Sequence, residues 1–90
     1  MFKTLEELIT VIRQRKESST EESYTSKLIN NKKLSIEKVK EEIAELIDAI
    51  EKNTNKVHEA ADVLYHLMMY LEANGIKIEE IMAELANRKK

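Results

Sequence analysis

The sequence contains no cysteine, no proline and only one glycine. Without cysteine, a disulfide framework and a cysteine-based zinc site are both excluded. Because proline and glycine are the residues that most often interrupt helices, their near absence favours long helices joined by short loops. The aromatic residues are three tyrosines and one phenylalanine, so aliphatic side chains must fill most of the core.

A strong charge of one sign and long apolar runs are also missing. The formal net charge is −2, which argues against a nucleic-acid partner. No apolar run approaches the roughly 20 residues needed to span a bilayer, so no membrane partner is expected. The start of the chain shows no apolar segment of signal-peptide length. We therefore expect residues 1–90 to form a single cytoplasmic domain.

Hydrophobic periodicity predicts helices over about residues 5–17, 21–30, 35–52, 56–73 and 78–88. Thr4 and Ser19 each stand three residues before a glutamate, which is the pattern of a capping box, and Ser35 is the expected N-cap of the third helix. Gly75 follows the fourth helix, where a left-handed residue is often needed. The predicted fold class is all-α, a bundle of four to five helices.

The apolar residues of the third and fourth helices are arranged differently, and those of the fourth predict a partner subunit. Those of the third helix form one stripe, expected to face the core: Ile36, Val39, Ile43, Leu46, Ile47 and Ile50. In the fourth helix, apolar residues surround the whole circumference from Ala60 to Leu71. Five short helices can hardly enclose such a helix, so a second subunit is expected to cover it. A homodimer, or a larger assembly built from one, is the expected state.

Four carboxylates occur as two pairs at helical spacing, Glu42 with Glu45 and Glu59 with Asp62. Residues three apart share a helix face, so each pair can direct two oxygen ligands to one point. On a helical wheel, Glu42 and Glu45 flank the core edge whereas Glu41 points outward. If the two helices pack antiparallel, the pairs meet and repel each other unless a cation lies between them. Mg²⁺, or alternatively Mn²⁺, suits such an all-oxygen site.

Simpler interpretations exist for some of these residues. Acidic pairs at helical spacing are also typical of solvated helix faces, although the apolar surroundings of Glu59 and Asp62 make that interpretation weaker for them. We expect His66 to be a hydrogen-bonded core residue that supports the site, and His58 to lie on the surface. The cluster from Ser23 to Thr25 could serve as helix capping alone.

Three segments of the chain resemble one enzyme family. The spacing Glu-Glu-x-x-Glu from Glu41, followed by Glu-x-x-Asp from Glu59, resembles the signature of the MazG-like superfamily of all-α nucleoside-triphosphate pyrophosphohydrolases. Residues 23–28 (Ser-Tyr-Thr-Ser-Lys-Leu) and 59–67 (Glu-Ala-Ala-Asp-Val-Leu-Tyr-His-Leu) are similar to segments of the phosphoribosyl-ATP pyrophosphatases, a family of histidine biosynthesis. The resemblance extends over nearly the whole chain.

The resemblance implies a homodimeric helical bundle that uses Mg²⁺ to hydrolyse phosphoribosyl-ATP to phosphoribosyl-AMP and pyrophosphate. The implied metal ligands are Glu42, Glu45, Glu59 and Asp62, and Glu41 would orient water or a second ion. The implied substrate contacts are Ser23, Tyr24, Thr25, Lys27 and Lys38. Lys40 stands where the family usually has glycine, which puts a close backbone approach at that position in doubt.

Two other functions are compatible with the residues. One is a housecleaning pyrophosphohydrolase that acts on another nucleoside triphosphate, with the same metal site and a different base pocket. The other is a non-enzymatic helical interaction module in which the acids form a solvated face. The substrates hydrolysed separate the first possibility from the phosphoribosyl-ATP enzyme, and a stabilising response to Mg²⁺ separates both enzymes from the module.

Overall fold

The computed structural model describes residues 1–17 and 24–89, except for the side chains of Tyr24 and Ser26, and within these ranges it is all-α. The helices are α1 (Lys3–Lys16), α2 (Tyr24–Ile29), α3 (Lys32–Lys52), α4 (Lys56–Ala73) and α5 (Ile78–Arg88). This confirms the predicted fold class and the bounds of the last two helices. None of the helices described is long and apolar enough to cross a membrane.

The starts of α1 and α3 differ from the predicted capping residues. Phe2 occupies the N-cap of α1 and its carbonyl oxygen accepts a bond from the Glu6 amide at 3.1 Å, so Thr4 already lies inside the helix. The predicted N-cap at Ser35 is also wrong. The Asn31 side chain instead accepts from the Leu34 amide at 3.1 Å, which starts α3 one turn earlier and leaves Ser35 buried. The cap predicted at Ser19 lies outside the described residues.

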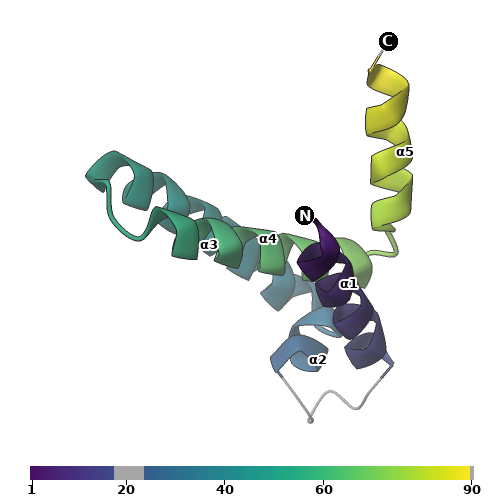
Figure 1. Cartoon of the computed structure of the whole chain (residues 1–90). Coiled ribbons are helices and arrows are strands. Elements are labelled where there is room, and N and C mark those ends of the chain that lie inside the picture. The colour runs from purple at the N-terminus through teal and green to yellow at the C-terminus, as the bar shows by residue number, and fades with distance from the viewer. Residues whose placement is uncertain (18–23, 90) are drawn as a thin grey trace.

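Helices α3 and α4 form an antiparallel hairpin that makes the most extensive helix contact in the described chain (Figure 1). Asn53 and Asn55, in the short connection, both adopt left-handed backbone conformations with φ of 55° and 46°. Asparagine tolerates this conformation better than most residues, which allows a tight reversal. Gly75 has φ of +72° immediately beyond α4, as the sequence predicted.

The apolar core lies at one end of this hairpin, where α1 and α2 pack against the second half of α4 (Figure 1). Its buried members come from these three helices: Ile9, Ile12, Leu28, Ile29, Met68 and Met69. The other end of the hairpin extends away from α1 and α2. Along that part, α3 and α4 pack only on each other among the described helices, and the acidic pairs are located there.

Three isoleucines of the predicted α3 stripe do not face the core, contrary to the sequence-based expectation, whereas Val39 of that stripe is buried and Ile36 and Leu46 are half-buried. Ile43, Ile47 and Ile50 have exposed fractions of 42%, 53% and 56%. The reason is that α3 turns a different side toward α4, and its buried residues are Ser35, Val39, Glu42 and Ala49. Apolar side chains of α4 are exposed as well, notably Val57 and Leu64. A large aliphatic surface is therefore uncovered within one chain.

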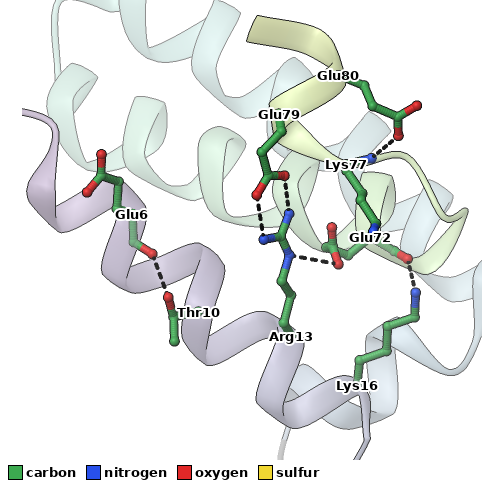
Figure 2. Close-up of polar contacts among 8 residues, drawn as sticks. All are labelled: Glu6, Thr10, Arg13, Lys16, Glu72, Lys77, Glu79 and Glu80. Carbon is green, nitrogen blue, oxygen red and sulfur yellow. Dashed lines mark hydrogen bonds and ion pairs between the residues drawn. The ribbon is translucent and has the colours of Figure 1, made fainter. Parts of the chain in front are cut away.

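Helix α5 projects from the bundle and contains no buried residue (Figure 1). Arg13 of α1 links it to the rest of the chain (Figure 2). Its guanidinium donates to both carboxylate oxygens of Glu79 at 2.6 and 2.9 Å, and to Glu72 of α4 at 3.3 Å. Lys16 donates to the Glu72 carbonyl oxygen at 2.7 Å. These contacts fix the direction in which α5 leaves α4.

The Arg13 guanidinium lowers the pKa of Glu79 to about 2. The ion pair is therefore fully formed above the ordinary range of carboxyl pKa values and is lost as the pH falls toward 2. Because Glu79 is largely exposed, solvent screens the pair and its contribution to the free energy of unfolding is small. Together with Ile78, which packs against the apolar core at the start of α5, the pair connects α5 to the rest of the chain.

Candidate metal centre

The antiparallel hairpin brings the two predicted acidic pairs to the same region. Glu42, Glu45 and Glu59 each offer a carboxylate oxygen, and these three oxygens all lie within 4.8 Å of one another. Glu42 is 8% exposed, Glu59 is half-buried and Glu45 is exposed. Glu42 therefore lies at the buried side of the group, in the contact between α3 and α4, and Glu45 lies at its solvent-exposed side.

Two oxygens of this group lack the hydrogen bonds that burial normally demands. Oε2 of Glu42 and Oε2 of Glu59 are buried and accept no hydrogen bond from any residue that the structure describes. A buried carboxylate oxygen without a donor is costly, and burial of an uncompensated charge is costlier still. These oxygens accordingly favour a cation as their missing partner.

The electrostatics of Glu42 and Glu59 agree with this interpretation. Burial raises the pKa of Glu42 above its ordinary value, and the adjacent Glu45 carboxylate raises it further, while His66 acts in the opposite direction. Burial also raises the pKa of Glu59, followed by the charges of Glu45 and Asp62. The carboxylates of Glu45 and Asp62 thus disfavour the ionisation of Glu42 and Glu59, and a bound divalent cation would relieve this repulsion.

The residues present fit a hard divalent metal ion. All three members of the group supply oxygen, which is the donor type that Mg²⁺ and Mn²⁺ prefer. The exposed position of Glu45 leaves the site open to solvent on one side, so water or a phosphate could complete the coordination of such an ion. Buried oxygens without donors, mutual repulsion and oxygen chemistry together support a metal centre more strongly than spacing alone did.

Asp62 occupies a second group that shares Glu59 with the first. His58, Glu59 and Asp62 have ligand atoms within 4.8 Å of one another, and His58 Nε2 lies 3.4 Å from Asp62 Oδ2. His58 is exposed, as expected, but its proximity to the acids was missed from the sequence. The signal was present, because His58 precedes Asp62 by four residues and therefore shares its helix face.

The other predicted site residues on α3 are paired with each other. Lys38 Nζ lies 3.5 Å from Glu41 Oε2. Glu41 is exposed and points away from the buried Glu42, in agreement with the helical wheel. Lys40 is also exposed. Glu41 and Lys38 thus form a charged pair at the solvent side of α3, outside the group of three carboxylates.

The predicted substrate segment is only partly described. Ser23 and the side chain of Tyr24 lie outside the described part of the structure. Of the other two residues, which are both on α2, Thr25 is buried and Lys27 is exposed. The Thr25 hydroxyl forms a hydrogen bond with the Tyr65 hydroxyl of α4. The sequence resemblance included Tyr65 but assigned it no role, so this contact is new.

His66 is a buried, hydrogen-bonded residue of α4, as predicted. Its Nδ1 lies 2.8 Å from the carbonyl oxygen of Asp62. Because a carbonyl can only accept, Nδ1 carries the hydrogen and donates it. The ring also meets that of Tyr65 edge to face, with centroids 5.2 Å apart. His66 therefore contacts both the backbone of Asp62 and the ring of Tyr65.

Replacing Glu42 with glutamine is expected to stabilise the metal-free protein at neutral pH. Because the folded protein binds the Glu42 proton more tightly than the unfolded chain, stability falls as the pH rises from the ordinary carboxyl pKa through the raised one. Glutamine cannot ionise, so the Glu42→Gln protein should lose less stability than the wild type over the same rise in pH. Thermal unfolding in a chelator from about pH 4 to pH 8 measures this difference.

The exposed Glu51 provides a matched control for this substitution, because Glu51→Gln makes the same chemical change on the same helix, outside the carboxylate group. A Glu42→Gln protein whose melting temperature follows the wild-type pH profile would contradict the expected cost of ionising Glu42.

The chain is similar to known proteins over most of its length. Residues 5–89 match the family described as phosphoribosyl-ATP pyrophosphohydrolase. A phosphoribosyl-ATP pyrophosphatase of Methylobacterium nodulans is 47% identical over 92 residues, covering 94% of this chain and 82% of the relative. One from Haloarcula marismortui is 38% identical, with coverage of 94% and 92%. A histidine biosynthesis bifunctional protein of Pyrococcus furiosus is 44% identical over 96% of this chain and 41% of its own length.

Proposed function

Because this chain belongs to the phosphoribosyl-ATP pyrophosphohydrolase family, and is therefore a hydrolase of histidine biosynthesis, we propose that it converts phosphoribosyl-ATP to phosphoribosyl-AMP and pyrophosphate. The reaction adds water across the anhydride between the α and β phosphorus atoms. One P–O bond breaks and one forms, and pyrophosphate leaves. We further propose that residues 1–90 act as one domain, in the cytoplasm.

The observation that carries this proposal is the pair of buried oxygens, Glu42 Oε2 and Glu59 Oε2, that lack a donor in the described structure. We propose that these two glutamates, with Glu45 and Asp62, hold Mg²⁺, and that Mn²⁺ can replace it. Bound there, the ion would neutralise charge on the phosphate oxygens and lower the pKa of bound water.

The remaining residues serve to bind and orient the substrate. Lys38 and Lys27 offer ammonium groups to the phosphate chain, which would otherwise meet a strongly acidic site. Glu41, held beside Lys38, would orient the attacking water or a second ion. Ser23, Tyr24 and Thr25 are assigned to the substrate side of the site by the family resemblance. Together these roles supply alignment and charge stabilisation, the two main requirements of phosphoryl chemistry.

We propose that the active protein is at least a homodimer. A compact monomer of this size is expected to expose about 5,400 Å² and to have a radius of gyration of about 12 Å. This chain exposes 6619 Å² and has a radius of gyration of 14.1 Å. The excess of roughly 1,200 Å² is larger than the about 800 Å² that each partner buries in a standard interface. The exposed isoleucines of α3 provide apolar surface for that purpose.

The purified protein is expected to release pyrophosphate from phosphoribosyl-ATP with a kcat/KM at least about a hundredfold higher than for ATP, dCTP or other common triphosphates. The reason is that the α2 segment can contact a phosphoribosyl group that ordinary triphosphates lack. Comparable rates across the panel would favour the housecleaning function. No hydrolysis, with no change in melting temperature at millimolar Mg²⁺, would favour the interaction module. Growth of a histidine-requiring strain lacking this activity provides the cellular test.

A further inference from the structure

A hydrogen bond joins two parts of the proposed site that are 40 residues apart in sequence. The Thr25 hydroxyl of α2 meets the Tyr65 hydroxyl of α4. Thr25 is 8% exposed, so its hydroxyl has little access to competing water. Near its other end, α2 is anchored by the buried Leu28 and Ile29. The short helix is thus fastened by apolar contacts at one end and by this bond near its start.

Tyr65 is well placed to connect α2 with the carboxylates. It follows Asp62 by three residues, so the two side chains are neighbours on α4. Its ring packs edge to face against His66, whose Nδ1 donates to the Asp62 carbonyl oxygen at 2.8 Å. The Tyr65 ring is therefore held by a neighbour that is itself bound to the backbone of Asp62. A continuous series of contacts runs from Asp62 through His66 and Tyr65 to Thr25.

We propose that Tyr65 is a positioning residue whose hydroxyl, through Thr25, holds the α2 segment in a fixed place relative to the carboxylates of α3 and α4. This rests on the proposed function, because one substrate molecule must reach from the acids to α2. The buried Thr25 hydroxyl acts by holding the segment, while the exposed Lys27 remains accessible to the substrate. Tyr65 touches no reacting atom, so its loss weakens substrate binding rather than the chemical step.

The test is the Tyr65→Phe substitution in the whole protein, because phenylalanine keeps the ring and removes only the hydroxyl. We expect KM for phosphoribosyl-ATP to rise on the order of five- to tenfold. We expect kcat, and the Mg²⁺ concentration that gives half the thermal shift, to stay within about twofold. The Thr25→Val substitution should reproduce the effect, and the double substitution should add nothing. Additive losses, or a fall in kcat with KM unchanged, would overturn the proposal.

Amide hydrogen exchange provides a readout that does not depend on activity. In the Tyr65→Phe protein the amides of residues 25–29 should exchange faster, whereas those of residues 39–50 should keep their wild-type rates and so report an intact hairpin. Tyr70→Phe is the matched control, because it removes a hydroxyl from the same helix that forms no hydrogen bond with the described residues. Unchanged exchange over residues 25–29 would overturn the proposal, even if phosphoribosyl-ATP proved not to be the substrate. If Tyr65→Phe failed to fold, Thr25→Val would decide the question by the same measurement.

Discussion

Replacing Glu59 with glutamine is expected to reduce kcat for pyrophosphate release by at least about a hundredfold, since even the loss of an outer partner of a metal ligand typically costs 10- to 100-fold. Glu59 is the best choice because it belongs to both groups of metal-binding side chains, with Glu42 and Glu45 on one side and His58 and Asp62 on the other. Glutamine keeps the length and shape of the side chain but removes its charge. The site then loses a ligand without losing its packing.

A loss of folding can be distinguished from this loss of a ligand. Because burial and neighbouring charges raise the pKa of Glu59, removal of its charge relieves repulsion, and the metal-free variant should melt no lower than the wild type. The variant should also lose the increase in melting temperature that Mg²⁺ gives the wild type. Asp62→Ala should likewise be inactive but still dimeric. An active Asp62→Ala or Glu59→Gln protein would remove these residues from the metal site.

Asp48→Asn is the matched control for both substitutions. Asp48 lies on α3 but is exposed, and it pairs with Lys52 at 3.2 Å rather than with the acidic group. Surface pairs of this kind contribute little to stability, so the control should keep its activity and its response to Mg²⁺. Equal losses in the control and in Glu59→Gln would indicate a general effect of removing negative charge.

The helices could be predicted from the sequence because their signals are local. Apolar periodicity fixed α4 and α5 to the residue, and the requirement for a left-handed residue after α4 identified Gly75. The starts of α1 and α3 were predicted less accurately. Thr4 and Ser35 both fit a capping pattern, but the competing cap at Asn31 is equally good locally, and burial of Ser35 decides between them. Burial depends on tertiary packing, which a local pattern does not contain.

Some features of the candidate site could likewise be predicted from the sequence, and others could not. The spacing of Glu42, Glu45 and Glu59 was sufficient to predict their proximity once an antiparallel hairpin was assumed. The positions of Asp62 and Tyr65 were harder to predict. Whether Asp62 also joins the group of Glu42, Glu45 and Glu59 depends on the rotation of α4 against α3, which helical spacing does not define, whereas its place beside His58 follows from their spacing on α4. The bond from Tyr65 to Thr25 depends on where α2 docks, and that is set by Leu28 and Ile29 in a core shared by three helices.

The exposed isoleucines of α3 show why an apolar pattern alone does not identify the surface against which a helix face packs. Periodicity correctly identified Ile43, Ile47 and Ile50 as members of one face, but it cannot tell whether the face is buried within the chain or between chains. In the structure the side of α3 that faces α4 carries Glu42 and Ala49 instead, and the isoleucines remain exposed. An acidic residue thus takes the buried position inside one chain, which leaves the aliphatic face available for a second copy.

Placing a glutamate at Ile47 is therefore expected to weaken self-association at least about a hundredfold, because an unpaired buried charge costs several kcal/mol. In a symmetric dimer each substitution occurs twice, which increases the effect. Sedimentation or light scattering over a range of protein concentrations measures the change. Because the stability of a dimer increases with concentration, the wild-type melting temperature should rise on concentrating the sample, and that of Ile47→Glu should not.

Lys52→Glu supplies the matched control, since Lys52 is exposed on the side of α3 away from Ile47 and the substitution also introduces a glutamate. This control should self-associate like the wild type. If Ile47→Glu and Lys52→Glu both remained dimeric, the isoleucine stripe could not be the interface. In that case the apolar surface of α4 around Val57 and Leu64 would be the next candidate, and a glutamate at Leu64 would test it by the same measurement.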